Sequence, residues 1–505
     1  MWQSFLDAVT KVNAFVNDLV WGWPVIILIL GTGLLLTIRT KALQLRKFGD
    51  SWASTIIPTV KSLGKKKQKD TGARSVSQFE AFSAAISGTV GTGNIVGVTA
   101  AILTGGPGAV FWMWISAFFG MVTNYSENVL GLYYRKKDKD GNFSGGAFYY
   151  AANGLGWKWL GYVAAAFAML AAIGMSGVQT NKISSTISAT LGSHIALDPT
   201  VFKLAIGVVI ALITALIVIG GIQRIGKVAS MLVPFMSLFF IVLSLITIVS
   251  HYQNILPAFG FIFGHAFTAK AAAGGVLGYT FATVIRKGMA RGVFSNEAGL
   301  GSSVIAHSAS ETREPVKQGL WGIFEVFFDT FIICTLSALM FLTTVDLDTL
   351  TGSEIDTDMS IKVFTANFGT FGAAAFSVIL PLFAFTTIIA WSYYGEKATE
   401  FFFQWLGDKG KKTAATVFKV LFVLLIVASA VITSDLAWGI SDTFNGLMAI
   451  PNLISVVALS GMVAKITKNY YDRKKGLNVE PMLSAYPDLN EEFKRDIAGG
   501  NAEMK

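Results

Sequence analysis

The residues best suited to bind a ligand lie in one glycine-rich run, residues 87–94, which reads Ser-Gly-Thr-Val-Gly-Thr-Gly-Asn. The run interrupts a segment that is otherwise apolar enough to cross a membrane. A glycine in a helix interior costs about 1 kcal/mol relative to alanine, so Gly88, Gly91 and Gly93 predict a locally unwound helix. Unwound backbone is tolerated at membrane depth where its N–H and C=O groups line a cavity. We therefore expect this run to bind an ion or a small zwitterion.

An amino-acid zwitterion needs N–H donors for its carboxylate and oxygen acceptors for its ammonium group. An unwound segment displays both. The amides of Thr92 and Gly93 are the expected donors, because they begin the second half of the helix, and the partial positive charge of a helix N-terminus attracts anions.

A second polar group lies in the apolar segment 383–391. Thr386 and Thr387 supply hydroxyls that can replace the water shell of a cation beside an unwound helix. Trp391 follows Thr387 by four residues and therefore shares its helical face. We expect Trp391 either to wall off a substrate side chain or simply to pack between helices.

Three carboxylates, Glu127, Glu325 and Asp329, fall inside apolar segments. Burying such a group costs at least about 2.5–3.5 kcal/mol by insertion scales, so each is a functional candidate. Glu325 and Asp329 are four apart on one face and form either a proton relay or a gate. Pairing with Lys182, or with solvent near a helix end, is the alternative; Lys182 itself is expected to pair or to extend to the membrane surface.

Residues 286–297 combine charge and glycine at an expected cytoplasmic boundary, and they are a candidate inner gate. Arg291, paired with an acidic residue, would hold this gate shut. A simple excess of positive charge on the cytoplasmic side explains Arg286 and Lys287, but it does not explain the Ser-Asn-Glu cluster that ends at Glu297.

Composition defines the class of protein. The chain is 53% hydrophobic and only 14% charged, and its mean hydropathy is +0.57, which predicts an all-α protein that crosses the lipid bilayer several times. No phosphate loop, no His/Cys metal cluster and no local nucleophile–base arrangement is present, so we expect neither catalysis nor a cofactor. The net charge of +9 is interpreted as a topology signal and not as nucleic-acid binding. The single cysteine, Cys334, excludes an intrachain disulfide and is expected in the core.

Eleven stretches have spanning length. They cover residues 22–38, 80–103, 108–134, 159–190, 201–223, 228–250, 267–286, 318–345, 370–404, 413–435 and 436–465. The connection after the first stretch is rich in lysine and arginine, which places it in the cytoplasm and the N-terminus outside. Alternate connections are also basic, so residues 286–291 are expected inside, as is the C-terminus. Residues 22–38 are expected to be a retained span, and residues 2–20 an interfacial helix or an extension of that span.

The ten spans after the first divide into two sets of five, about 80–250 and about 267–465. An odd number per set makes the second set start from the opposite side, which predicts an inverted repeat. The chain thus divides into residues 1–75, a ten-helix core at 76–465 and a cytoplasmic polar tail at 466–505. The first helix of each set is expected to be discontinuous, the second through Gly274, Gly275 and Gly278, although these glycines are as well explained by close helix packing.

Several separated motifs resemble the alanine/glycine:cation symporters, the sodium:alanine symporter family, along nearly the whole chain. These motifs are Gly-Thr-Gly-Asn at 91–94 with the following Ile-Val-Gly, Gly-Gly-Pro-Gly-Ala-Val-Phe-Trp-Met-Trp at 105–114, Arg-Gly-Val-Phe-Ser-Asn-Glu-Ala-Gly at 291–299, and Trp-Ser-Tyr-Tyr-Gly-Glu at 391–396. The family is similar in fold to the leucine-transporter-like (LeuT) superfamily. Residues 89–94 also resemble the broken first core helix of sodium-coupled neurotransmitter transporters.

The resemblance implies secondary transport of a small neutral amino acid, alanine or glycine, into the cell with Na⁺ as the coupling ion. Carbonyls near Thr89 would receive the ammonium group together with Gln179, which matches a family glutamine; an interhelical hydrogen bond is the plainer role for Gln179. The resemblance also implies the ion ligands. Sodium would contact main-chain oxygens of Ser87, Val90 and Phe383 and the hydroxyls of Thr386 and Thr387, a neutral oxygen cage that suits a hard cation.

Two alternatives remain open at this point. Ser176 is smaller than the residue expected at its position in the family, which widens the pocket for a larger amino acid such as glutamine or merely alters packing. Proton coupling through the intramembrane carboxylates is the competing energy source. Outside transport, the same helices would suit an amino-acid-sensing receptor or a channel.

Overall fold

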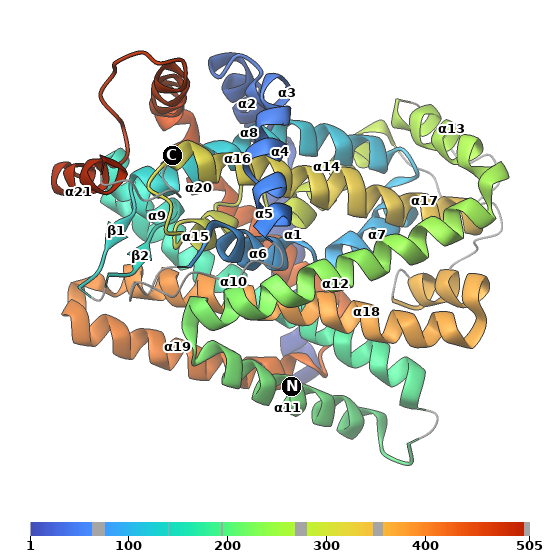
Figure 1. The fold of residues 1–505 in the computed structure, drawn as a ribbon. Coiled ribbons are helices and arrows are strands. Elements are labelled where there is room, and N and C mark those ends of the chain that lie inside the picture. Colours follow the sequence, from blue (N-terminus) through green and yellow to red (C-terminus); the bar gives the residue numbers. More distant parts are fainter. Residues whose placement is uncertain are drawn as a thin grey trace.

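The computed structural model describes residues 2–62, 76–139, 141–192, 195–267, 280–346 and 357–498, and these are almost entirely helical (Figure 1). Eight helical stretches are long and apolar enough to cross a membrane. The other three of the eleven expected spans correspond to α8 (Ala109–Tyr133) and to two interrupted helices that begin at Gln78 and at Phe281. The second of these helices begins later in the chain than expected. The fold is therefore the all-helical membrane architecture that the composition predicts.

The helices before the first interrupted one form the N-terminal part of the chain. Their bounds are α1 (Trp2–Val20), α2 (Trp23–Arg39), α3 (Leu43–Arg46), α4 (Phe48–Ser54) and α5 (Ile56–Ser62). Helix α1 is separate from α2 and packs along α20 (Ser434–Lys474). Asn17 Nδ2 donates to Thr443 Oγ1 at 3.2 Å, and Trp21 Nε1 donates to Asp442 O at 2.9 Å. Residues 2–20 are thus attached to the helical core along their last turn.

The first set of five helices begins with an interrupted helix. Its elements are α6 (Gln78–Thr89), η1 (Thr92–Asn94), α7 (Val96–Gly105), α8 (Ala109–Tyr133), β1 (Lys136–Lys137), β2 (Phe143–Ser144), α9 (Ala147–Tyr149), η2 (Tyr150–Gly154), α10 (Lys158–Leu191), α11 (Pro199–Val218) and α12 (Gly221–Ser250). Ser77 and Glu80 form a capping box that starts α6. Val90 and Gly91 are extended, so the predicted unwound segment is present.

The second set also begins with an interrupted helix, after the linking elements η4 (Tyr252–Asn254) and α13 (Ile255–Ala266). Its elements are α14 (Phe281–Asn296), α15 (Ser303–His307), α16 (Pro315–Val326), η5 (Phe327–Cys334), α17 (Thr335–Thr344), α18 (Thr357–Phe402), η7 (Gln404–Leu406), α19 (Gly407–Ser429) and α20. Helix α18 is kinked at Gly369. The five-plus-five order agrees with the predicted inverted repeat.

The second interruption lies at residues 297–302 and not where the sequence predicted it. Glu297, Gly299 and Gly301 all adopt positive φ, at 55°, 94° and 72°, and this conformation ends α14 before α15 begins. The expected span 267–286 therefore belongs to a helix that starts later, at Phe281. The glycines at 274, 275 and 278, expected to interrupt it, lie outside the described residues.

Corresponding helices of the two sets pack against each other: α8 against α16, α10 against α18, and α11 against α19. Helix α10 carries a row of buried alanines that lets α18 approach closely. Both unwound segments are fully buried within this frame.

The C-terminal tail does not leave the molecule after residue 466. Helix α20 continues to Lys474, and α21 (Pro487–Ala498) then packs beside the β1–β2 hairpin (Figure 1). Phe493 contacts Phe143 with ring centroids 5.9 Å apart, and Arg313 Nε lies 3.0 Å from Asp496 Oδ2.

Candidate functional site

The first unwound segment touches α10 and α18 at Gly91. A Cβ at this position would lie 2.6 Å from Thr387 Oγ1, so Thr387 would have to move, and 3.3 Å from Gln179 Nε2, which is a tight contact. Glycine fits here without displacing either side chain. The structure therefore brings together Gln179, Thr387 and the unwound segment, three features that the sequence analysis assigned to one site.

Side chains hold the unwound backbone in place. The Thr92 amide donates to Gln179 Oε1 at 3.2 Å, and the Gly91 amide donates to Asn94 Oδ1 at 2.8 Å. Gln179 thus makes an interhelical hydrogen bond, which is the plainer of the two roles expected from the sequence. The Thr92 amide was expected to face a carboxylate, and its direction toward an oxygen acceptor fits that role.

The residues expected to bind a cation lie near the end of α6 and along α18, two helices that pack against each other. Ser87, Val90, Phe383, Thr386 and Thr387 are all fully buried. Both threonine hydroxyls donate to the Phe383 carbonyl, at 2.9 and 3.1 Å, so their oxygen lone pairs stay available as acceptors. Across the described ranges no three His, Cys, Asp or Glu side chains cluster as a metal site would. The available donors are neutral oxygens, which suit a hard cation.

Two buried hydroxyls near this segment have no hydrogen-bond partner, Thr92 Oγ1 and Ser176 Oγ. Ser176 precedes Gln179 on α10 by three residues, so the two share a helical face. An unsatisfied buried polar group costs about 1–3 kcal/mol. A polar ligand would supply the missing partner at either hydroxyl.

Trp391 is fixed by a polar contact that the sequence did not predict. Its Nε1 donates to Glu297 Oε1 at 2.9 Å, and Ser302 Oγ donates to Glu297 Oε2 at 2.5 Å. Trp391 and Glu297 are both fully buried. The tryptophan therefore ties α18 to the second unwound segment in addition to packing.

The model of the sodium:alanine symporter family matches residues 6–483. The chain belongs to this family. It is accordingly a membrane transporter and not an enzyme.

Individual relatives and solved structures agree with this assignment. The sodium/alanine symporter AgcS of Methanococcus maripaludis is 39% identical over 93% of this chain and 99% of that protein. The probable sodium/glutamine symporter GlnT of Bacillus subtilis is 33% identical over 91% of this chain and 90% of that protein. The structure of MhsT with L-phenylalanine has a TM-score of 0.55 at 15% identity, covering 78% of this chain and 99% of that one. The structure of a Na⁺-coupled sialic acid symporter has a TM-score of 0.52 at 12% sequence identity, and the match covers 94% of this chain and 96% of that chain. The transporter therefore has the LeuT-like fold.

In this transporter two of the intramembrane carboxylates hold the unwound segments. Asp329 Oδ1 accepts from Asn94 Nδ2 at 2.5 Å, and Asp329 Oδ2 accepts from Ser295 Oγ at 2.8 Å, so one side chain joins both interrupted helices. Thr330 Oγ1 also donates to Asp329.

Glu127 Oε1 plays a similar part at the second break. It accepts from the Gly299 amide at 3.1 Å and from Asn452 Nδ2.

The predicted relay between Glu325 and Asp329 is not formed by direct contact. Glu325 Oε2 lies 2.7 Å from His307 Nε2, and Asp329 bonds to the residues named above. Lys182 Nζ donates to Ser434 Oγ at 2.7 Å. The π-helical turn η5 begins between the two acids, which changes the angle between their side chains from that of a regular helix.

Arg291 forms a two-pronged ion pair with Asp442 on α20, at 2.9 and 2.7 Å. Its guanidinium also lies over the Trp438 ring at 4.8 Å. Phe294, one turn further along α14, covers the unwound segment, because a Cβ at Gly93 would lie 3.0 Å from Phe294 Cδ1. The sequence suggested an acidic partner for Arg291 but did not identify Asp442. The position of Asp442 inside the apolar segment 436–465 was the signal that could have found it.

The expected cytoplasmic location of this gate disagrees with the expectation that the N-terminus lies outside. Arg286 donates to the carbonyl of Trp21 at 3.3 Å and to Asp18 at 3.4 Å, so α14 starts at the same end of the molecule as α2. The opposite end of the second interrupted helix meets the basic residue Arg135, which donates to Ser308 O at 3.1 Å. The ion pair between Arg291 and Asp442 therefore lies toward the end of the molecule where the first span starts.

Proposed function

We propose that this transporter carries a small neutral amino acid, alanine or glycine, together with Na⁺ by alternating access. The observation that carries the proposal is the unwound segment at Gly91 pressed between Gln179 and Thr387. It offers amide donors, carbonyl acceptors and hydroxyls in one buried place. Family membership and the likeness to a sodium/alanine symporter support sodium-coupled amino-acid symport. They favour transport over the receptor or channel alternative.

The amino acid is proposed to lie along the unwound segment. Its carboxylate would bind the amides of Thr92 and Gly93, displacing Gln179 Oε1 from Thr92. The freed Gln179 oxygen and the carbonyls near Thr89 would then accept from the ammonium group. Trp391 would close the side-chain end, together with Thr387.

Sodium is proposed to bind between α6 and α18. The main-chain oxygens of Ser87, Val90 and Phe383 and the hydroxyls of Thr386 and Thr387 are its ligands in this proposal. The ion would order the unwound segment against α18 and so prepare the amino-acid site, which makes binding of the two ligands mutually cooperative. A membrane potential of about 100 mV contributes about 2.3 kcal/mol per charge. A tenfold sodium gradient adds about 1.4 kcal/mol, so one ion supports an amino-acid gradient of about 500-fold.

Glutamine is the second candidate substrate, and the buried hydroxyl of Ser176 favours it. This hydroxyl lacks a partner and would bond to a side-chain amide. The likeness to a probable sodium/glutamine symporter supports the same alternative.

The deciding experiment is uptake of labelled alanine, glycine and glutamine into proteoliposomes. An inward sodium gradient is compared with an equal potassium gradient and with a proton gradient. Concentrative uptake only with sodium supports the proposal and ranks the three substrates. Uptake driven by protons alone contradicts sodium coupling.

We also propose that this transporter lies in the cell membrane with its N-terminus outside and its C-terminus in the cytoplasm. The lysines and arginines that follow the first span support this orientation, whereas the basic residues 286–291 lie at the opposite end of that span.

A further inference from the structure

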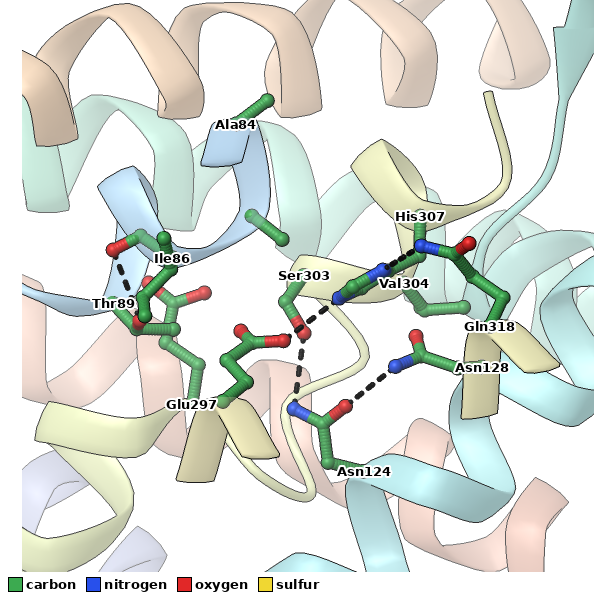
Figure 2. Close-up of polar contacts among 12 residues, drawn as sticks. Ala84, Ile86, Thr89, Asn124, Asn128, Glu297, Ser303, Val304, His307 and Gln318 are labelled. Carbon is green, nitrogen blue, oxygen red and sulfur yellow. Dashed lines mark hydrogen bonds and ion pairs between the residues drawn. The ribbon is translucent and has the colours of Figure 1, made fainter. Parts of the chain in front are cut away.

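A buried histidine–carboxylate pair lies outside the proposed ion and amino-acid sites. His307 ends α15, and its Nε2 lies 2.7 Å from Glu325 Oε2 on α16. On the other side of the ring, Gln318 Nε2 lies 2.6 Å from His307 Nδ1 (Figure 2). Gln318 and Glu325 are seven residues apart on α16, so both reach the imidazole from one helical face. All three side chains are fully buried.

One proton satisfies the contacts of the pair in this arrangement. The Gln318 amide nitrogen can only donate, so Nδ1 accepts from it and carries no proton there. A proton on Nε2 then donates to Glu325 Oε2 across 2.7 Å.

The same side chains also accommodate a second proton. Gln318 Oε1 is buried and has no hydrogen-bond partner. A half-turn of the Gln318 amide brings this oxygen onto Nδ1, where it would accept from an imidazolium N–H. The states with one and with two protons thus differ by rotation of the Gln318 amide, and both ring nitrogens keep a hydrogen-bond partner in each state. A lone histidine or a lone carboxylate in this position would not keep its partners in both states.

The acidic groups around the pair favour binding of a second proton. Glu127 on α8, Glu297 before α15, Asp329 on η5 and Tyr394 on α18 all lie close enough to interact with Glu325. Helix α6 has no titratable residue between 81 and 89.

The carboxylates around the pair are held by neutral hydrogen-bond donors. The donors to the surrounding carboxylates are neutral amides, hydroxyls and an indole. Arg135, a buried cation beside the connection that follows α15, donates to the main-chain carbonyls of Ser308, Ser310 and Thr312. On the far face of α16, Asp50 of α4 is paired with Lys47 and Lys474. Several carboxylates in a dry interior favour uptake of a proton or cation.

A continuous set of contacts joins the pair to the proposed site. Thr387, beside Gly91, and Trp391 are one turn apart on α18. Trp391 bonds to Glu297, and Glu297 bonds to Ser302 at the start of α15. Helix α15 is only five residues long and ends at His307. A displacement of the second unwound segment therefore moves the imidazole relative to Glu325 and Gln318.

We propose that the His307–Glu325 pair is a proton-binding site whose occupancy is coupled to binding of the amino acid. The coupling rests on the proposed transport function. In the closed arrangement, with Arg291 bound to Asp442, the pair holds one proton. Ligands that favour this arrangement expel the second proton, so alanine affinity rises with pH, by at most about tenfold per pH unit for one proton.

The test measures protons directly. Alanine is titrated into the full-length transporter in detergent at saturating sodium, by calorimetry in buffers of different ionisation enthalpy, from about pH 5.5 to about pH 8. The variants His307→Gln and Glu325→Gln each keep a hydrogen bond but remove the titrating pair. His251→Gln is the matched control, because His251 is bonded to its own helix at Thr247 O.

We expect the wild type and His251→Gln to release a fraction of a proton for each alanine bound, and both pair variants to release none. Glu325→Asp should restore part of the release. No proton release in the wild type, or the same release in both pair variants, overturns the proposal.

Failure of the proposed function gives a different result, namely that neither the wild type nor any variant shows sodium-dependent alanine binding. The pair is then tested without ligand, by infrared difference spectra between high and low pH. A pH-dependent carboxyl band that Glu325→Gln and His307→Gln both alter supports the proton site. A band unchanged in both overturns it.

Discussion

Asn94, in the first unwound segment, donates to Asp329 on η5 at 2.5 Å, and the second oxygen of the same carboxylate accepts from Ser295 at the end of α14. The two interrupted helices are therefore held together by one buried side chain. In the proposed alternating-access cycle, this contact would make the two interrupted helices move as a unit.

Replacing Asp329 tests this contact. Asp329→Ala leaves Asn94 and Ser295 without their acceptor, and we expect the free energy of unfolding to fall by about 2–4 kcal/mol. Asp329→Asn keeps one acceptor oxygen and should be affected less. Denaturation of the purified transporter in detergent, with sodium-driven uptake as a second readout, measures both. Equal effects of the two substitutions would contradict the structure.

Gly91→Ala should abolish sodium-driven uptake, because its Cβ would lie 2.6 Å from Thr387 Oγ1. Gly31→Ala on α2 is the matched control, since a Cβ there meets nothing within 4 Å. Uptake is measured in proteoliposomes at equal protein content. Normal transport by Gly91→Ala would show that the unwound segment is not held against α18 as described.

Trp391→Phe keeps an aromatic ring but removes the donor to Glu297. A buried carboxylate oxygen then loses its partner, which we expect to lower the free energy of unfolding by about 1–3 kcal/mol and to reduce uptake. Trp405→Phe serves as a control because Trp405 is 68% exposed. If the two variants are equally stable in thermal denaturation, the bond between Trp391 and Glu297 contributes nothing.

Removing sodium should destabilise the transporter. A ligand at 100 times its dissociation constant adds about 2.7 kcal/mol to the stability of the form that binds it. Replacement of sodium by potassium should therefore lower the melting temperature of the wild type. Thr387→Val should lose this sodium effect, whereas Thr399→Val, further along α18, should keep it, because its hydroxyl bonds only to Gly395 O. The same sodium effect in both variants would exclude Thr387 as a ligand.

Asp442→Asn should open the gate that Arg291 closes. A cysteine placed at Gly97, where a Cβ would lie 3.7 Å from Trp438, reports access to the site. We expect a thiol reagent that cannot cross the membrane to label Gly97→Cys several-fold faster when Asp442→Asn is present. The parent chain is the background control, because its single cysteine, Cys334, is buried. Unchanged labelling would mean that the ion pair does not limit access.

The class of protein, the two sets of five helices and the first unwound segment can be predicted from the sequence. These follow from local properties. Apolar length requires a membrane span, and three glycines within six residues prevent a regular helix at 87–94. Gln179 was assigned to the site only through the family resemblance. That Gln179 and Thr387 both reach Gly91 depends on the packing of α10 and α18.

The second interruption and the partners of the buried charges depend on tertiary packing. The break at 297–302 depends on positive φ at Glu297, a residue that does not itself require this conformation, and the charged residues before it resembled a cytoplasmic loop. Asn94 and Asp329 are 235 residues apart in sequence, and Arg291 and Asp442 are 151 apart. Such pairs are selected by which polar groups meet when the helices close around them, because a buried charge requires a partner and sequence spacing does not specify one.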